Sequence, residues 1–349
     1  MKKIILVSSG ANGGAQRVAI LIAKILRNSG FECLILFATD DEKKIAVKKA
    51  VGDIPYEVLQ CKRRYLLYYL YNRLRREKDV ILFGSLPSFC QLILILNMLL
   101  GNRFKVVLRE TNTPSRHKKI DIWFARMFYR FADRLISQTK EMCNEMMALY
   151  HLPASKIVTI NNPIDKELVH NSIKERYNMD TSFINYVAIG RGAPQKDLVT
   201  MIKAFAIVCH QQPNSRLYLV GNWVEEYRKI IDIQIKQYGL QKNVLFEGLQ
   251  SNPFKYMIAA NAFVMSSIYE GLPNAMIEAM YLGKPVVVTE CIPYISQVVH
   301  NGINGYTTPV GDADAFAKAM LYVTKIKKIE KFHDVNNSEQ QIIELFNSI

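Results

Sequence analysis

The sequence has little of what anchors a chain in a membrane. Its longest apolar stretch, 86–100, is shorter than the roughly 20 residues that a spanning helix needs, and it contains Pro87, Gln91 and Asn97. We expect a buried helix there and no transmembrane anchor, with a membrane-dipping helix as the alternative. The apolar run Ile4–Val7 is too short for a signal peptide and favours a buried first strand.

Cysteine and histidine are also scarce, and neither forms a motif. The six cysteines lie far apart, so no CxxC pair is available for metal binding or redox chemistry. We therefore expect buried free thiols in a reducing cytosol. The six histidines have no ligand spacing, and no DxD pair lies in a plausible loop, so we predict no metal site.

Acidic residues are outnumbered, and almost all of the basic excess lies in one half of the chain. Residues 1–165 carry 27 Lys and Arg against 14 Asp and Glu, whereas residues 166–349 carry 18 against 17. Such a field attracts an anionic surface or polymer, and composition alone does not choose between nucleic acid and membrane lipid. Half of the 349 residues are apolar, which excludes a disordered chain and suits two domains.

Short apolar strands alternate with amphipathic helices along the chain. We expect strands at 4–8, 33–37, 80–83, 105–108, 134–137 and 158–160, and again at 186–189, 216–220, 244–246, 262–265 and 285–288. Apolar strands between helices indicate parallel sheets that are covered on both faces. Two such series joined near Pro163 predict an α/β chain of two Rossmann-like domains facing a cleft, with ligands at the carboxyl ends of the strands.

The strongest local signal is SSIYEGLPNAMIEAMYLGKPVVV, residues 266–288. After an expected strand it has a tight loop and then a helix that begins near Asn274, with Ser266 and Asn274 as candidate caps and Pro273 suited to a helix start. The free amides of this turn could hold an oxygen-rich ligand. A helix-dipole role explains Glu278 fairly well, but it explains Glu270 less well, because Glu270 lies in the loop after the strand.

This segment resembles the E-x7-E signature of the retaining glycosyltransferase family 4, of the bacterial polysaccharide and lipopolysaccharide type. Glu270-x7-Glu278 is followed by AMYLGKPVVV. The resemblance spans nearly the whole chain and is looser between residues 40 and 108. Similar patterns occur in order at 13–18 (GGAQRV), 132–137 (ADRLIS), 160–165 (INNPID), 190–197 (GRGAPQKD), 217–221 (LYLVG), 244–249 (VLFEGL), 302–305 (GING) and 309–312 (PVGD).

The resemblance implies the GT-B fold and a division of labour. Residues 1–164 are expected to form an acceptor-binding domain, and residues 165–325 a nucleotide-sugar-binding domain. A helix within 326–349 is expected to pack back on the first domain. One departure is Ser296–Val299, where the family usually has PEIV, so a carboxylate role there is in doubt.

The resemblance also implies roles for residues of the donor site. Arg191 and Lys196 would stabilise the leaving diphosphate in place of a metal, although a solvated basic loop explains the pair if it is taken alone. Glu270 would position the sugar, and Glu278 would accept hydrogen bonds from the ribose. The implied donor-binding residues are Gly13, Gly14, Gly190, Arg191, Lys196, Gly221, Glu270, Gly271, Leu272, Pro273, Asn274 and Glu278.

The acceptor side is marked by Glu110 and Asn112, which follow the expected strand 105–108. Glu110 is a candidate base or acceptor-positioning residue, and a salt bridge to Arg109 or Arg116 is the alternative. The expected catalytic residues are Arg191, Lys196, Glu270 and Glu110.

Two segments, 62–78 and 116–134, combine aromatic and basic residues at helical spacing. Basic amphipathic helices of this kind often lie on anionic membranes. Core-facing helices with a solvated basic face are the alternative. Their presence in one half of the chain favours peripheral contact with an anionic membrane over nucleic acid.

The resemblance thus implies a metal-independent, retaining hexosyl- or N-acetylhexosaminyltransferase. It would move a sugar from a nucleotide-sugar co-substrate, expected to be a UDP-sugar, to a saccharide acceptor, expected to be lipid-linked, in cell-surface polysaccharide or lipopolysaccharide biosynthesis. No further cofactor is expected, and the expected location is the cytoplasmic face of the inner membrane. The alternatives are an epimerase or phosphorylase of the same fold, or a non-enzymatic membrane- or nucleic-acid-binding module.

Overall fold

The computed structural model describes residues 2–10, 13–38, 51–326, 329 and 337–349. It divides into two compact units, of which the first contains Met1–Pro163 and Asp334–Ile349 and the second Ile164–His333. Of the predicted C-terminal segment 326–349, residues 327–328 and 330–336 lie outside the described residues. In sequence, the second unit is an insertion between two parts of the first.

The first unit is built on seven parallel strands in the order β3-β2-β1-β4-β5-β6-β7. The order reverses beside β1, which is the doubly wound arrangement. The central strands are buried along almost their whole length because helices cover both faces of the sheet. The strands are β1 (Lys3–Ser8), β2 (Glu32–Ala38), β3 (Tyr56–Leu59), β4 (Val80–Ser85), β5 (Lys105–Arg109), β6 (Arg134–Ser137) and β7 (Ile157–Thr159).

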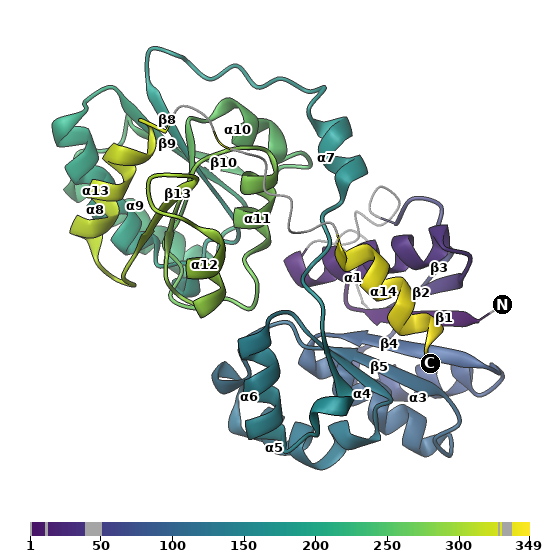
Figure 1. Cartoon of the computed structure of the whole chain (residues 1–349). Coiled ribbons are helices and arrows are strands. Elements are labelled where there is room, and N and C mark those ends of the chain that lie inside the picture. Colours follow the sequence, from purple (N-terminus) through teal and green to yellow (C-terminus); the bar gives the residue numbers. More distant parts are fainter. Residues whose placement is uncertain (1, 11–12, 39–50, 327–328, 330–336) are drawn as a thin grey trace. The chain divides into compact units, whose positions relative to one another are not determined.

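Two helical layers enclose this sheet (Figure 1). Strand side chains alternate between them, so that Ile5 and Val7 pack under α3–α6, whereas Ile4 and Leu6 pack under α1 and α14. The helices are α1 (Gly14–Asn28), α3 (Leu66–Leu74), α4 (Pro87–Leu99), α5 (Lys119–Phe128), α6 (Lys140–Tyr150) and α14 (Ser338–Asn347), with short 3-10 turns η2 (Arg63–Tyr65), η3 (Pro114–Arg116), η4 (Tyr129–Phe131) and η5 (Ala154–Lys156). No helix in the described ranges is long and apolar enough to cross a membrane.

The C-terminal helix α14 returns to the first unit, as predicted. It packs beside α1, and its Phe346 lies against Phe83 of β4 in a T-shaped pair with ring centroids 5.7 Å apart. Both rings are fully buried. The last residues of the chain therefore complete the core that the first residues begin.

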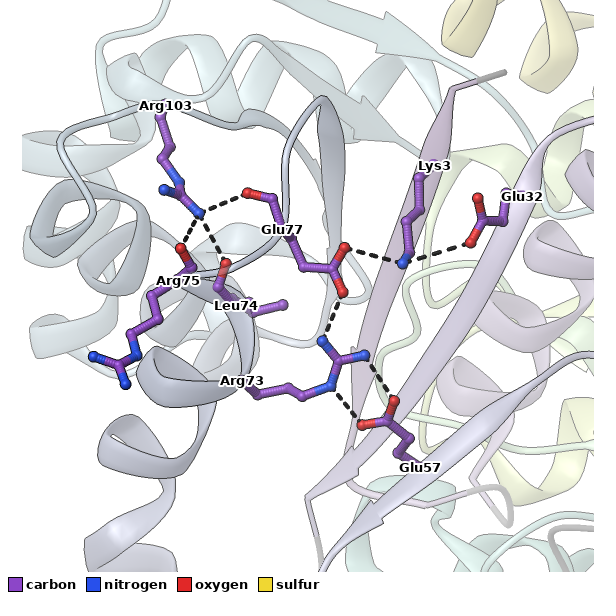
Figure 2. Close-up of polar contacts among 8 residues, drawn as sticks. All are labelled: Lys3, Glu32, Glu57, Arg73, Leu74, Arg75, Glu77 and Arg103. Carbon is purple, nitrogen blue, oxygen red and sulfur yellow. Dashed lines mark hydrogen bonds and ion pairs between the residues drawn. The ribbon is translucent and has the colours of Figure 1, made fainter.

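A charged network fastens α3 to the amino end of the sheet (Figure 2). Arg73 of α3 donates two hydrogen bonds of 2.7 Å to Glu57 of β3 and one of 2.6 Å to Glu77. Glu77 also accepts from Lys3 of β1 at 3.0 Å. Arg103 donates to the last carbonyls of α3, including that of Leu74 at 3.0 Å. Because a cation at a helix C-terminus is favourable, these contacts fix the end of α3.

The second unit repeats the architecture with six parallel strands in the order β10-β9-β8-β11-β12-β13. Its core packs α8, α9 and α13 against one face of the sheet. The strands are β8 (Ile184–Ile189), β9 (Ser215–Val220), β10 (Val244–Gly248), β11 (Ala262–Met265), β12 (Val286–Thr289) and β13 (Gly305–Thr308). The helices are α7 (Lys166–Ser172), η6 (Pro194–Lys196), α8 (Leu198–Gln211), α9 (Glu225–Gln237), α10 (Phe254–Ala259), α11 (Asn274–Tyr281), α12 (Pro293–Val298) and α13 (Ala313–Val323).

The sequence did not predict the strands β3 and β13. Among the described residues, each pairs with one neighbour only, and β3 has no buried residue. Their sequences, YEVL and GYTT, lack the continuous apolar run that marks the central strands. The six cysteines are free, but only Cys33, Cys61 and Cys90 are fully buried.

Candidate functional site

The loop after β8 carries Arg191 between Gly190 and Gly192, in a tightly packed stretch of backbone. A Cβ on Gly221 would lie 1.8 Å from the carbonyl oxygen of Gly190, and one on Gly192 would lie 2.3 Å from the Trp223 ring. Backbone hydrogen bonding continues past the ends of β8 and β9, where the Gly192 amide donates to the Asn222 carbonyl at 2.8 Å. The backbone around Arg191 is therefore fixed, while its side chain is exposed.

Lys196 and Glu270 form an ion pair between two loops that are 74 residues apart in sequence. The Lys196 Nζ lies 2.6 Å from Glu270 Oε1, which also accepts a 2.7 Å hydrogen bond from the Ser267 hydroxyl. Glu270 is 8% exposed. The two loops are also joined by their backbones, since the Ile268 amide donates to the Gln195 carbonyl at 2.9 Å. Glu270 is thus an engaged carboxylate that holds the Lys196 ammonium in place.

A pocket opens beside this pair at the carboxyl ends of β8, β9 and β11. Gly190, Arg191 and Lys196 line it together with Trp223 and Ser266. Two cations at the mouth of a pocket can bind an anionic ligand such as a diphosphate. The carboxyl edge of a parallel sheet is also where open α/β folds bind their ligands.

Trp223 belongs to this pocket, and sequence reasoning missed it. Its ring packs on Phe246 with centroids 5.0 Å apart, and the Arg228 guanidinium lies over Phe246 at 3.3 Å. Within the described part of the chain, the buried Trp223 Nε1 has no hydrogen-bond partner. The sequence signal that could have identified Trp223 is its position directly after LVGN, at the end of an expected strand.

The loop before α11 differs in one detail from the expectation. Pro273 occupies the N-cap position and makes no side-chain capping hydrogen bond. Ser266 instead donates to the carbonyls of Lys196 and Asp197 at 2.8 and 2.9 Å, because its hydroxyl faces the loop after β8. Gly271, Leu272 and Pro273 are buried, and Asn274 and Glu278 are partly exposed.

The predicted residues of the first unit lie at the carboxyl end of its own sheet. Gly13 precedes α1, and Gly14 is the first residue of that helix, after β1. Glu110 follows β5 and is 5% exposed, whereas Asn112 is partly exposed. The Glu110 oxygens accept from the Thr111 amide at 2.8 Å and the Tyr150 hydroxyl at 3.1 Å.

The ionisable ring that faces Glu110 across the loop is that of His117, with Nε2 3.4 Å from Oε1. Arg109 turns instead to the hydroxyl of Ser85, at 3.1 Å, and to Asn162. Burial lowers the pKa of Arg109 to about 10. Asn162 and Gln138 extend this buried polar network across the ends of β4–β7.

The described residues hold no group of three or more His, Cys, Asp or Glu side chains arranged to bind a metal ion. Arg191 and Lys196 are the charged residues among those that line the pocket after β8. Of the predicted donor residues, the structure brings together Gly190, Arg191, Lys196, Gly221 and Glu270 at one strand edge.

Two family models match the chain almost end to end. The model described as Glycosyltransferase Family 4 matches residues 12–168, and the one described as Glycosyl transferases group 1 matches residues 170–341. An uncharacterized glycosyltransferase of Methanocaldococcus jannaschii is 34% identical over 215 residues, which cover 57% of this chain and 52% of that protein. This chain therefore spans about half the length of that relative.

A second relative matches over most of both chains. It is the N-acetylgalactosamine-N,N'-diacetylbacillosaminyl-diphospho-undecaprenol 4-alpha-N-acetylgalactosaminyltransferase of Campylobacter jejuni, 24% identical over 319 residues, 83% of this chain and 81% of that one. Among solved structures, Anabaena HepE in complex with UDP-glucose aligns over 100% of both chains with a TM-score of 0.79 and 21% identity. That structural likeness concerns the fold.

Proposed function

We propose, on the premise that this chain belongs to the GT-B glycosyltransferases of the family 4 type, that it transfers a sugar from a UDP-sugar to a lipid-linked saccharide. The observation that carries the proposal is the Lys196–Glu270 pair beside Arg191, at the carboxyl edge of the second sheet. A UDP-sugar offers the diphosphate that two such cations bind. The UDP-glucose complex of HepE supports this donor class.

The proposed roles follow from charge and position. Arg191 and Lys196 stabilise the negative charge that develops on the leaving diphosphate, which is an effective source of catalysis. Glu270, with the amides of the Gly271–Asn274 loop, positions the donor sugar. Glu278, partly exposed on α11, accepts hydrogen bonds from the ribose hydroxyls.

The reaction is proposed to retain the anomeric configuration. The bond between the anomeric carbon and the diphosphate oxygen breaks, and the acceptor oxygen bonds to the same face of that carbon. The acceptor proton passes to the departing diphosphate oxygen. The engagement of Glu270 with Lys196 and Ser267 supports this route, because a carboxylate held by two donors is a poor nucleophile. An α-linked UDP-sugar then gives an α-linked product.

A lipid-linked acceptor is supported by the relative from Campylobacter jejuni, whose name specifies a diphospho-undecaprenol substrate. Cell-surface polysaccharide or lipopolysaccharide assembly is the process that we propose. Such an acceptor would bring the chain to an anionic membrane, on the cytoplasmic face of the inner membrane.

The outer surface of α3, α4 and α5 supports this membrane contact. These neighbouring helices bury one side against the same face of the first sheet. With their flanking turns they leave ten large apolar side chains at least 37% exposed. These are Tyr65, Tyr68, Tyr69, Ile95, Met98, Leu99, Ile120, Trp123, Met127 and Phe131.

Cations accompany these apolar side chains. In the range 62–131, Asp79 is the only exposed acidic residue. Aromatic and basic side chains together match the interface of an anionic bilayer, where each nearby Lys or Arg is worth about 1 kcal/mol. The exposed cations are Lys62, Arg64, Arg75, Arg76, Lys78, Arg103, Lys105, Arg116, Lys118, Lys119, Arg126 and Arg130.

The transferase proposal is tested by incubating the chain with a panel of UDP-, GDP- and ADP-sugars and undecaprenyl-diphosphate saccharides. Release of the nucleoside diphosphate is measured, and the anomeric configuration of the product is determined by NMR. We expect UDP release, a retained configuration and activity that persists with EDTA. An inverted product contradicts the retaining mechanism. Full activity in both Glu278→Ala and Lys196→Ala contradicts the proposed donor site.

A further inference from the structure

We infer that Glu110 is a positioning residue, which acts with Tyr150 and His117 to fix the 111–117 loop as the surface that the acceptor meets. The inference rests on the proposed function and gives Glu110 a role other than that of a base. Its starting point is the place of the loop at the carboxyl end of β5, the edge at which open α/β sheets bind ligands.

The Glu110 carboxylate is buried, and both of its oxygens already accept hydrogen bonds. Its side chain is 2% exposed. Oε1 accepts from the amides of Thr111 and Asn112 at 2.8 and 3.4 Å, and Oε2 accepts from the Tyr150 hydroxyl at 3.1 Å. A general base must come within about 2.6–3.2 Å of the oxygen whose proton it removes. A carboxylate enclosed by its own loop does not offer that approach to an acceptor hydroxyl.

His117 closes the loop at its other end. Its Nδ1 lies 3.1 Å from the Tyr150 hydroxyl, and its Nε2 lies 3.4 Å from Glu110 Oε1. The imidazole is 9% exposed. Tyr150, which ends α6 and is 1% exposed, thus contacts the residue before the loop and the last residue of the loop. One hydroxyl from a packed helix fixes both ends.

The backbone at the start of the loop is held as well. The Glu110 amide donates to the Ile136 carbonyl of β6 at 2.9 Å, and the Gln138 side chain donates to the Glu110 carbonyl at 2.8 Å. Burial raises the pKa of the Glu110 carboxyl, while His117 acts in the opposite direction. The loop is therefore anchored by its backbone and by its side chains, and Asn112 remains partly exposed on it.

Tyr150→Phe and Glu110→Gln in the full chain test the inference, with acceptor KM, donor KM and kcat measured separately. The amide in Glu110→Gln keeps the size and an accepting oxygen, so we expect kcat close to wild type, whereas a base role predicts a loss of about 10²–10⁴. Tyr150→Phe removes the shared hydroxyl. We expect its acceptor KM to rise several-fold, with donor KM and kcat unchanged.

Tyr186→Phe is the matched control, because Tyr186 is a fully buried tyrosine of the second unit whose hydroxyl donates to the Met320 carbonyl at 3.0 Å. It should lose similar stability without a change in acceptor KM. Amide hydrogen exchange adds a readout that needs no activity. We expect faster exchange over 111–117 in Tyr150→Phe and not in the control.

Two results overturn the inference. The first is a folded Glu110→Gln chain that has lost kcat to the extent expected of a base. The second is a Tyr150→Phe chain that matches Tyr186→Phe in both acceptor KM and loop exchange. A wild-type chain with no transferase activity contradicts the proposed function instead, and the exchange comparison then decides whether Tyr150 fixes the loop.

Discussion

At the residue scale, the two cations of the pocket after β8, the proposed donor site, differ in their surroundings. Lys196 is ion-paired with the buried Glu270, whereas Arg191 is exposed on a fixed backbone. Removing Lys196 leaves a buried carboxylate without its cation, which costs stability as well as charge stabilisation. Removing Arg191 takes away charge alone. The two variants should therefore differ in stability although both lower activity.

The expected result is a loss of about 10²–10³ in kcat for Arg191→Ala, the range typical of one lost donor to a developing oxyanion. Its melting temperature should stay near wild type. Lys196→Ala should lower both kcat and the melting temperature. Lys203→Ala, an exposed lysine of α8, is the control for simple loss of charge. Equal melting temperatures for Arg191→Ala and Lys196→Ala would contradict the proposed difference.

Sequence reasoning found the residues that belong to a local motif and missed those that meet across the fold. Lys196 and Glu270 each stand in a recognisable pattern. Tyr150 is 40 residues from Glu110 in sequence, and its hydroxyl donates to the Glu110 carboxylate. Trp223 packs so closely on Gly192 that a Cβ there would clash with its ring. The distance between these residues along the sequence does not indicate that they are in contact in the folded chain.

At the element scale, α3 combines an exposed aromatic face with a firm attachment to the sheet. Hydrogen bonding from Arg73 lowers the pKa of Glu57, and the Arg73 and Lys3 contacts outweigh burial and lower that of Glu77. Carboxylates with a depressed pKa stabilise the fold above their unfolded pKa, near 4.5, and lose that contribution as the pH falls below it.

Arg73→Ala should therefore lower the melting temperature at neutral pH, and the difference from wild type should shrink in acid. Arg76→Ala, an exposed arginine just after α3, is the control. Thermal unfolding followed by circular dichroism from neutral pH to below pH 4.5 checks this. A difference that stays constant across that range would count against the network as a pH-dependent anchor.

The outer face of α3–α5 gives a prediction about membranes. Ile120 on α5 and Ile233 on α9 are both 64% exposed, so they form a matched pair on different units. Ile120→Ser should weaken co-sedimentation with anionic liposomes, whereas Ile233→Ser should not. Binding of the wild type should fall as salt is raised, because the attraction is partly electrostatic. Equal liposome binding by both variants would contradict the proposal that this face contacts the membrane.

At the scale of the whole molecule, the alternation of strands and helices was enough to predict two parallel sheets. The edge strands β3 and β13 escaped because their sequences, YEVL and GYTT, lack an apolar run, whereas the edge strands β7 and β10 contain one and were predicted. The return of α14 was implied by the resemblance, whereas its packing on Phe83 required the structure. Central strands are predictable because burial on both faces requires a continuous run of apolar side chains. A short, partly polar strand has no such run.

Deletion of residues 338–349 should destabilise the first unit and leave donor binding by the second. The deletion removes Phe346 and uncovers Phe83 and the buried side of α1. Burial of a large aromatic side chain contributes about 3–5 kcal/mol. We expect a lower first melting transition and unchanged affinity for UDP in calorimetry. A truncated chain that melts like the full one would show that α14 adds nothing to the core.

The return of α14 also has a consequence for the order in which the chain is made. A ribosome releases the second unit, Ile164–His333, before it releases the helix that closes the first. Domains made early usually finish folding first. Here the N-terminal unit must wait with a partly uncovered sheet face until α14 has been made. A product that stops after Ile164–His333 but before α14 therefore exposes the apolar side chains that α14 would cover, by which quality control can distinguish it from a chain that contains α14.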